Sequence, residues 1–354
     1  MNSQKTVVVG MSGGVDSSVA ALLLKQQGYR VIGIFMHNWD DNGTPFSECT
    51  ASHDWSDVAK ICATLDIPYY LVDYRKEYKE QVFKPFLADY SKGHTPNPDI
   101  LCNKYIKFDL LLKKACSLGA DYLATGHYAN TQAGKLLTSK DQSKDQTYFL
   151  HAICGKHLEK ILFPLGNLLK ADVRQIAKEH HLLTHNKKDS TGICFIGERK
   201  FDQFLANYLP RNPGDFCRLN GQVVGKHQGA CFYTIGQRRH LGLGGAGERW
   251  YVVKKDMAKN IVYVERSFSH PELYQDHLTA NALTWIQYSP KTPFVCQAKI
   301  RYRQEAQDCT IEKIENETVF VSFKNPQRAI TPRQSIVFYY KNECLGGAVI
   351  QENV

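Results

Sequence analysis

The chain has 354 residues, of which 43% are hydrophobic and 22% charged, and its net charge is +9 at pH 7. Its length predicts two to three domains, and its composition is ordinary for soluble globular protein. No apolar run approaches the roughly 18 residues that a membrane-spanning helix needs. Because the first ten residues (MNSQKTVVVG) do not resemble a signal peptide, we expect a cytoplasmic protein without membrane association. The basic surplus favours a polyanionic partner such as nucleic acid, although it is weak support alone.

The eleven cysteines include no C-x-x-C pair, so the usual spacing of a structural zinc site or an iron–sulfur cluster is absent. An odd cysteine count without a signal peptide also argues against a disulfide framework. Most of the thiols should be small buried hydrophobes, and the local sequence must indicate which are reactive.

Apolar runs alternate with helical patterns over the first third of the chain. Strands are predicted at 6–10, 31–36, 69–73 and 121–125, and helices at 17–28, 54–65, 76–92 and 103–118. This alternation predicts an α/β domain with a mostly parallel sheet. Ligands of such sheets bind at the carboxyl ends of the strands, which is where GMSGGVDSS, HNWDD and GHY lie.

The helical pattern continues through 146–184, and near residue 210 the chain becomes rich in glycine, proline and short β-like runs. After about residue 276 every pattern is that of a strand, which predicts a small β-barrel. We therefore predict three domains: residues 1–206 with the parallel sheet, residues 207–275 as a small central α+β or β domain, and residues 276–354 as a C-terminal β-barrel.

The segment SGGVDSS (12–18) follows the first strand, and it matches neither a Walker-type loop, whose lysine it lacks, nor a dinucleotide fingerprint. Its chemistry nevertheless suits an anion: Gly13 and Gly14 allow close backbone approach, and Ser17 stands where a helix begins. Asp16 would repel phosphate unless a metal lies between them, which implies Mg²⁺. A glycine turn capped by Asp and Ser is an equally open interpretation.

Cys102 lies in TPNPDILCNKYIKF (95–108), where two prolines favour an extended lead-in to a helix that we expect to start near Asn103. A helix N-terminus lowers the pKa of a thiol, and Lys104 and Lys107 add positive charge. These features favour a reactive cysteine over a buried one.

Cys194 lies in KKDSTGICFIGERKF (187–201), after Ser190, Thr191 and Gly192, which suit a turn. Two lysines precede it, but the local sequence alone leaves open whether this thiol is reactive.

The loop SGGVDS resembles the signature of the PP-loop ATP pyrophosphatases, whose domain is of the adenine nucleotide alpha hydrolase-like type and which adenylylate a carbonyl oxygen. Taken with the two cysteine segments, the whole chain resembles the tRNA-specific 2-thiouridylases. The resemblance rests on GMSGGVDSS, TPNPDILCN, ATGHYA, KDQTYFL, FPLGNLLKADVR, KKDSTGICFIGER, YTIGQRRHLGLGG, AKIRYR and CLGGAVI.

The resemblance implies an enzyme that uses ATP and Mg²⁺ to adenylylate the 2-oxygen of the wobble uridine of tRNA, and then replaces that oxygen with sulfur from a cysteine persulfide. The implied partners are the tRNAs for lysine, glutamate and glutamine and a persulfide-donating sulfur carrier protein. Sulfur insertion fits two cysteines, because one carries the sulfur and the other releases it.

The resemblance also implies roles for individual residues. Cys194 would carry the persulfide and Cys102 would resolve it, with a transient disulfide between them. Asp99 is a candidate general acid/base, with a helix N-cap as the alternative. The expected ATP contacts are Gly10, Met11, Ser12, Gly13, Gly14, Val15, Asp16, Ser17, Met36 and Gly126. The expected tRNA contacts are Asn97, Pro98 and Asp99 at the target base, and His127, Lys144, Asp145, Gln146, Arg301, Tyr302 and Gln334 elsewhere.

In AKIRYR, Lys299, Arg301 and Arg303 are predicted to alternate on one face of a strand, either as a tRNA-binding face or as an ordinary solvated one. One departure from the family lies nearby. The usual Pro-Gly-Gln is here Pro-Arg-Gln, and Arg333 loses the φ freedom of glycine while it could add a phosphate contact.

Two other hypotheses share the loop. An ATP-dependent amidotransferase or ligase acting on a small carbonyl substrate would need neither Cys194 nor a basic barrel. A non-catalytic RNA-binding module would keep the fold but tolerate Asp16→Ala.

Overall fold

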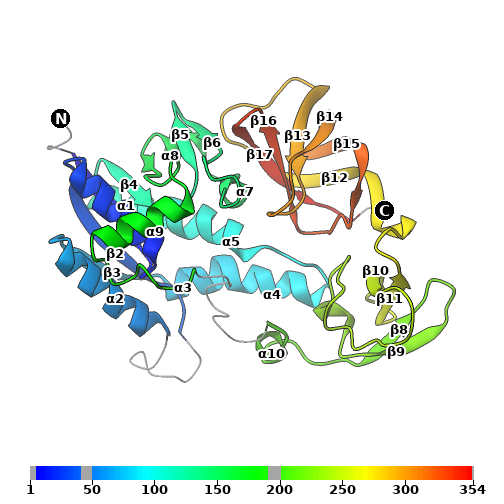
Figure 1. Cartoon of the computed structure of the whole chain (residues 1–354). Coiled ribbons are helices and arrows are strands. Elements are labelled where there is room, and N and C mark those ends of the chain that lie inside the picture. Colours follow the sequence, from blue (N-terminus) through cyan, green and yellow to red (C-terminus); the bar gives the residue numbers. More distant parts are fainter. Residues whose placement is uncertain (1–4, 41–49, 190–200, 353–354) are drawn as a thin grey trace.

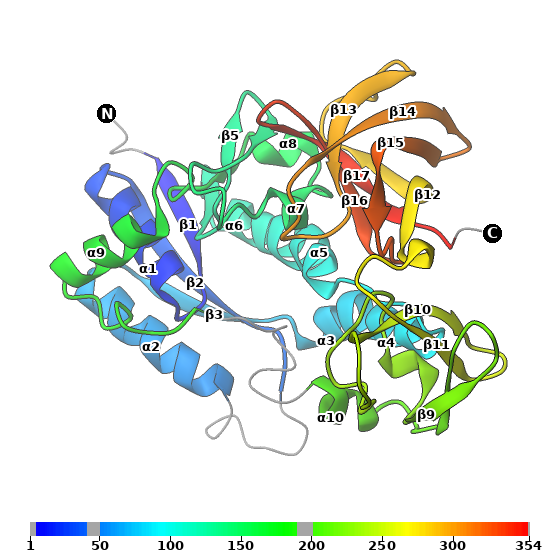
Figure 2. The same ribbon diagram turned by 45° about the vertical axis from the view of Figure 1, so that its right-hand side comes forward.

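The computed structural model describes residues 5–40, 50–189 and 201–352. These residues form a layered α/β domain, a small central sheet and a barrel (Figure 1). Helices α4 (Lys84–Ser91) and α5 (Pro98–Leu101) lie between the parallel sheet and the other two parts in both ribbon views (Figures 1 and 2). Within these ranges, no helix is long and apolar enough to cross a membrane.

The N-terminal sheet has five parallel strands in the order β3-β2-β1-β4-β7. They are β1 (Thr6–Met11), β2 (Arg30–His37), β3 (Tyr69–Asp73), β4 (Tyr122–Thr125) and β7 (Ile161–Leu162). The strand order reverses on the two sides of β1, so the carboxyl ends of β1 and β4 form the switch point where ligands of such sheets bind. The predicted α/β fold class is confirmed, whereas the short strand β7 was not foreseen.

Helices cover this sheet on both faces. They are α1 (Val15–Gln26), α2 (Thr50–Thr64), the run α5, η3 (Cys102–Leu111) and α6 (Leu112–Ser117), and α9 (Lys170–Glu179). The run α3 (Arg75–Tyr78), η2 (Lys79–Phe83) and α4 packs instead in a separate cluster with Cys102 and Ile106. The helix expected to start near Asn103 in fact starts at Pro98. Asn97 caps it by accepting a hydrogen bond from the Asp99 N–H at 3.1 Å, and proline suits the first helical position because it has no N–H to satisfy.

The C-terminal strands form the predicted barrel, which closes because β12 pairs with both β15 and β17. Its antiparallel strands are β12 (Tyr274–Trp285), β13 (Phe294–Lys299), β14 (Gln307–Glu315), β15 (Thr318–Arg328), β16 (Ser335–Tyr340) and β17 (Glu343–Ile350). The prediction that Lys299, Arg301 and Arg303 share a strand face is wrong. Strand β13 ends at Lys299 and the chain then turns.

A hairpin from the N-terminal half of the chain joins the barrel sheet. Strand β6 (Lys135–Leu137) pairs with β17, with Glu343 opposite Leu137, and β5 (Asn130–Gln132) pairs with β6 at the outer edge. Short helices α7 (Thr147–Leu150) and α8 (Gly155–Leu158) follow in the chain. This contact pairs segments about 200 residues apart, which local patterns do not reveal.

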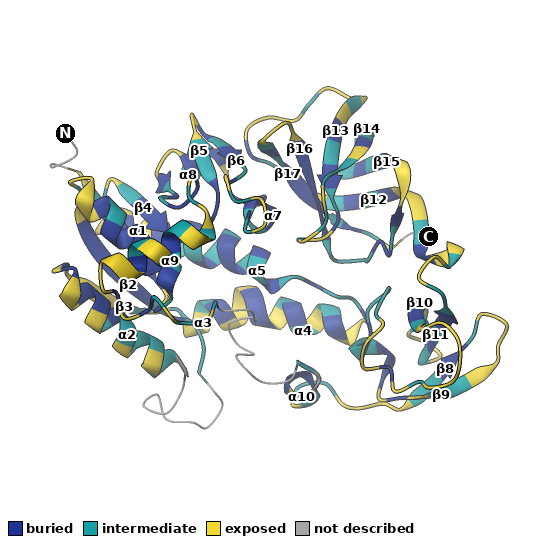
Figure 3. Cartoon of the chain, viewed as in Figure 1, coloured by how far each residue is buried: buried dark blue, intermediate teal, exposed yellow. Residues whose placement is uncertain are grey.

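The α/β domain and the barrel share one hydrophobic cluster, which holds Phe108 and Leu150 from the first and Val337 and Tyr339 from the second. Strands β1 and β2 of the parallel sheet and β16 of the barrel are largely buried, whereas the other barrel strands carry buried and more exposed residues together (Figure 3). The Tyr148 hydroxyl donates to the Ser335 carbonyl at 2.9 Å inside this interface. The interface is therefore a continuous core.

The central part is a separate four-stranded sheet in the order β10-β11-β8-β9. It follows α10 (Phe201–Ala206) and consists of β8 (Gly214–Cys217), β9 (Val223–His227), β10 (Trp250–Asp256) and β11 (Ile261–Arg266), with the short 3₁₀ turns η4 (Ala230–Phe232) and η5 (Pro271–Leu273). Its own small core contains Phe216, Val252 and Val264.

Tyr148→Phe should lower the free energy of unfolding by about 1–2 kcal/mol, because it leaves the buried Ser335 carbonyl without its donor. Chemical denaturation would measure the change. Tyr288→Phe is the control, since that side chain is 73% exposed. Equal stability of the two variants would contradict a tightly packed interface.

Candidate active site

The loop after β1 is held in a tight turn against α2. Gly13 has a φ of +72°, and a Cβ there would lie 2.8 Å from the Asp54 carbonyl oxygen, so only glycine fits. The Ser17 hydroxyl accepts from the Ser12 N–H at 3.2 Å, and the Ser18 hydroxyl donates to the Gly14 carbonyl at 2.8 Å. The loop thus leads directly into the N-terminus of α1, which favours anions.

Gly126 lets the end of β4 approach the start of α1. A Cβ at this position would lie 2.7 Å from both the Asp16 carbonyl carbon and the Ser17 nitrogen. The glycine of ATGHYA is therefore required for the two carboxyl-end segments of the switch point to meet.

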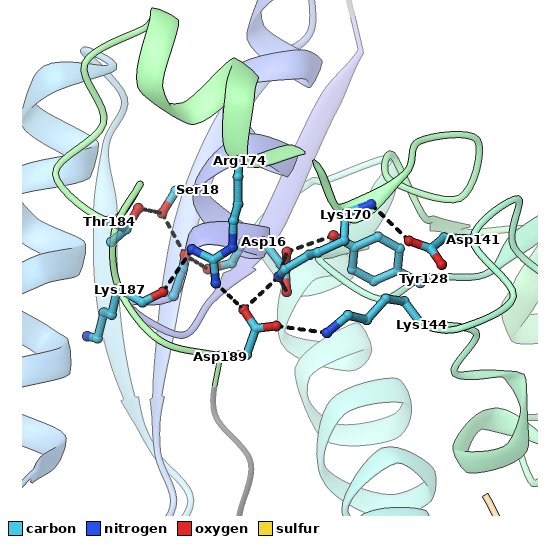
Figure 4. A network of polar contacts seen from close by, with 12 residues as sticks. Asp16, Ser18, Tyr128, Asp141, Lys144, Lys170, Arg174, Thr184, Lys187 and Asp189 are labelled. Carbon is cyan, nitrogen blue, oxygen red and sulfur yellow. Dashed lines mark hydrogen bonds and ion pairs between the residues drawn. The ribbon is translucent and has the colours of Figure 1, made fainter. Parts of the chain in front are cut away.

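Lys170, from α9, supplies the cation that the loop sequence lacks (Figure 4). Its Nζ lies 2.6 Å and 2.8 Å from the two carboxylate oxygens of Asp16, and its side chain is 11% exposed. The Tyr128 hydroxyl donates to the same carboxylate at 2.9 Å. Burial and the Asp16 charge raise the pKa of Tyr128, so it remains a phenol donor.

Asp189 is the second anion of this network and joins three cations. Its carboxylate lies 2.9 Å from the Lys170 Nζ, 2.9 Å from the Lys144 Nζ and 2.7 Å from an Arg174 guanidinium nitrogen (Figure 4). Burial opposes ionisation, but the hydrogen bonds and charges of Lys170 and Lys144 together lower the pKa of Asp189 to about 2. Asp189 is therefore an ionised partner at neutral pH.

Lys187 ties the same segment to α2, since its Nζ lies 2.8 Å from Asp54 and 2.6 Å from Asp57. Sequence reasoning assigned no role to Lys170, Arg174 or Asp189, although they lie in FPLGNLLKADVR and KKDSTGICFIGER. The four-residue spacing of Lys170 and Arg174 places both on one helix face, and this spacing could have indicated a shared anionic partner.

The expected ATP contacts lie in this loop, in β1 and β2, and just after β4. Gly10 lies in β1, Met11 and Val15 are core residues with 1% and 3% exposure, and Met36 is half-buried near the end of β2. Contacts from Met11 and Val15 would therefore have to come from the backbone. These assignments stay predictions.

Cys102 is 2% exposed and lies beyond the first turn of its helical run, because that run begins at Pro98. The argument from a helix N-terminus is therefore weakened. The segment that starts at Cys102 has π-type hydrogen bonding, a local geometry that is frequent at functional sites. Cys194 lies outside the described residues, so its separation from Cys102 and the expected transient disulfide stay predictions.

Asp99 is not the N-cap of its helix, because Asn97 takes that place. Burial raises the pKa of the Asp99 carboxyl, and the positive charge of Lys107 opposes this only in part. A carboxyl that holds its proton more tightly than usual suits the expected acid/base role better than a capping role.

Several expected tRNA contacts are engaged within the protein. Asp145 is 4% exposed and accepts from the Ser139 N–H at 2.9 Å and the Thr147 hydroxyl at 2.5 Å. Gln146 accepts from the Tyr128 N–H at 3.0 Å. These bonds support the residues around the loop, as does the contact between Lys144 and Asp189.

His127 lies in a half-buried site. Its Nδ1 is 2.7 Å from the Thr125 hydroxyl, and its ring packs on Phe108. Burial, aided by the charge of Lys107, lowers the pKa of His127 well below its usual value, so the ring is neutral.

A groove of about 690 Å³ runs between the 138–145 segment and the barrel. Tyr302 lines it and packs on Phe149 with ring centroids 4.3 Å apart. Three further lining residues are basic, namely Lys299, Arg303 and Lys341. Arg301 donates to the Arg328 carbonyl at 2.6 Å, and Gln334 donates to the Thr95 carbonyl. The structure thus brings Tyr302 to the groove and Gln334 to the segment that precedes Asn97.

Three family models match consecutive parts of the chain: the tRNA methyl transferase HUP domain at residues 5–198, the tRNA methyl transferase PRC-barrel domain at 202–266, and the aminomethyltransferase beta-barrel domain at 275–350. The first of these is the α/β domain that carries the loop and the Lys170 network.

Curated relatives match over nearly the whole chain. A tRNA-specific 2-thiouridylase MnmA from Protochlamydia amoebophila is 55% identical, over 99% of this chain and 95% of that protein. One from Bacillus subtilis is 53% identical, over 98% and 95% respectively. The chain belongs to the tRNA-specific 2-thiouridylase family, as the sequence predicted.

Among solved structures, a 4-thiouridine synthetase–RNA complex with bound ATP is 18% identical, with a TM-score of 0.39, over 58% of this chain and 50% of that one.

Gly126→Ala should weaken ATP binding by about tenfold or more, because its Cβ would push β4 away from the start of α1. Isothermal calorimetry with ATP would measure this. Gly244→Ala is the control, since a Cβ there meets no atom within 4 Å. Unchanged ATP affinity in Gly126→Ala would show that the close approach does not shape the site.

Proposed function

We propose that this protein is a tRNA-uridine 2-sulfurtransferase, which replaces the 2-oxygen of the wobble uridine with sulfur at the expense of ATP. The observation that carries the proposal is full-length membership of the 2-thiouridylase family together with an anion-binding loop at the switch point of the sheet. The family models carry methyltransferase descriptions, but the two cysteine segments of this chain suit sulfur transfer.

ATP would be held by the loop and by Lys170. The backbone of Ser12–Ser17 and the amides at the start of α1 would face its phosphates, and the Lys170 ammonium is the cation already in place at the loop. The loop lacks its own lysine, and Lys170 of α9 would take that place, where its charge would stabilise the departing pyrophosphate. Adenylylation then converts the uracil 2-oxygen into a good leaving group.

The site fits Mg²⁺, because the ion commonly binds through one or two carboxylates plus substrate phosphates, and the Asp16 carboxylate would be its protein ligand. The charge of the ion would offset that of the phosphates. Among the residues that the structure describes, Lys170 is the cation paired with Asp16.

Sulfur transfer would use two thiols. Cys194, charged by a sulfur carrier protein, would attack C2 of the adenylylated uracil through its terminal persulfide sulfur, and AMP would leave with the former oxygen. Cys102 would then attack the Cys194 sulfur, which releases the 2-thio group and leaves a Cys102–Cys194 disulfide that a thiol reductant must reduce. Asp99 would move the proton at the target base.

The substrate test is mass spectrometry of nucleosides from unmodified tRNA for glutamate, incubated with the protein, ATP, Mg²⁺ and sulfide. A gain of 2-thiouridine that requires ATP would establish the reaction. Release of pyrophosphate without 2-thiouridine would indicate that a sulfur carrier is needed. Absence of both would favour the alternative of an ATP-dependent ligase for a small carbonyl substrate.

Cys194→Ser should keep tRNA-dependent pyrophosphate release and lose 2-thiouridine formation, because the activation step needs no thiol. Cys102→Ser should also abolish turnover. Cys116→Ser is the control, since Cys116 is an exposed free thiol on α6. Thiolation at the wild-type rate by Cys194→Ser would refute the persulfide assignment.

Lys170→Met should weaken ATP binding roughly tenfold to a hundredfold, because a charge-assisted bond to phosphate is worth about 1.5–3 kcal/mol. Calorimetry at fixed salt would measure it. Lys178→Met, an exposed position on the same helix, is the matched control. Equal ATP affinity of the two variants would exclude Lys170 from the phosphate site.

A further inference from the structure

Three consecutive residues that precede the Asn97–Cys102 segment are each bound by another part of the chain. The Gly93 carbonyl accepts from Lys255 of the central sheet. The His94 Nε2 lies 3.1 Å from Glu352, beyond the last barrel strand. Thr95 contacts both the central domain and the barrel. This short stretch is thus the junction of all three domains.

Thr95 is fixed through its side chain and its carbonyl. Its hydroxyl lies 2.9 Å from the Thr234 hydroxyl of the central domain, and its carbonyl accepts from the side-chain amide of Gln334. Gln334 stands just before β16 of the barrel. The barrel therefore holds the backbone directly before Pro96.

A displacement at Thr95 would pass on to the residues that follow. Pro96 and Pro98 have fixed φ angles, so the chain between them cannot easily absorb a shift. Asn97 caps the helical run that contains Cys102. Movement of the barrel turn would therefore move the start of this run.

Arg333 strengthens the junction at a position where the family usually has glycine. Its φ of +69° lies in the left-handed region, which is unfavourable for arginine. Its Nε lies 2.9 Å from a carboxylate oxygen of Asp89 on α4, an ion pair without hydrogen-bond alignment, since the Arg333 Nε has no hydrogen-bond partner. The Asp89 side chain is only 15% exposed, so this pair anchors the barrel turn on α4.

We propose that Gln334 is a positioning residue for Cys102: through the Thr95 carbonyl, the barrel sets the place of the Asn97–Cys102 segment. The catalytic meaning of this inference rests on the proposed function. The barrel, which is expected to contact tRNA, would then also position Cys102, the expected resolving cysteine. A role of Gln334 solely in contacting tRNA would not produce this coupling.

The first test uses the reduced full-length protein without RNA. Alkylation of Cys102 by iodoacetamide, followed peptide by peptide with mass spectrometry, should be roughly three- to tenfold faster in Gln334→Ala, as expected for loss of one interdomain hydrogen bond. Gln287→Ala is the matched control, because the Gln287 side-chain amide also bridges the domains, donating to the Ala133 carbonyl at 3.0 Å.

The control should leave the Cys102 rate at the wild-type value. An unchanged rate in Gln334→Ala, or an equal rise in Gln287→Ala, would overturn the inference, the latter because it would indicate general loosening of the domain contacts. This readout needs no thiolation, so it is independent of whether the proposed function is correct.

The second test uses thiolation at saturating tRNA. A positioning role predicts that Gln334→Ala lowers kcat by roughly three- to tenfold. A rise in KM with kcat unchanged would overturn the inference while leaving the proposed function intact.

Discussion

The ion pair between Lys170 and Asp16 is the contact on which the active end of the α/β domain depends. A carboxylate at the start of a helix repels a further anion there, and a buried ammonium needs a partner of opposite charge. In the ion pair, the Lys170 ammonium offsets the negative charge of Asp16, and Asp16 is the partner that the buried ammonium needs. The pair also joins α9 to α1, so that Asp189, Lys144 and Arg174 gather beside the loop. These contacts hold the loop with Asp16, the segment with Lys144 and helix α9 with Lys170 together at one edge of the sheet.

Much of the fold could be predicted from the sequence, because strong local patterns govern it. The runs TVVVG and YLAT contain no charged residue and are mostly apolar, which is typical of buried parallel strands. The glycines of the loop also predicted a tight turn, which the structure has: the φ of Gly13 is +72°, a value that few other residues adopt. The family motifs indicated the correct family for a similar reason. They include positions, such as Gly13 and Gly126, where the fold leaves no space for a side chain.

The remaining features depend on contacts between distant segments. Lys170 looked like an ordinary residue of an amphipathic helix, and only the packing of α9 on α1 brings it to Asp16. Asp145 looked like a surface residue of a polar motif, yet the fold buries it. The helical run that contains Cys102 starts earlier than its sequence predicts, because proline, which favours extended chain before it, also fits the first helical position after a capping Asn.

The β5–β6 hairpin has a consequence for how the chain is made. Its partner strand β17 lies at the far end of the sequence. On the ribosome, the hairpin and Leu136 emerge long before β17, so their edge stays unpaired while some 200 further residues are synthesised. The β5–β6 hairpin therefore gains its partner in the barrel only after β17 has been synthesised, and chains that stop short of β17 would present an open sheet edge to quality-control proteases and chaperones.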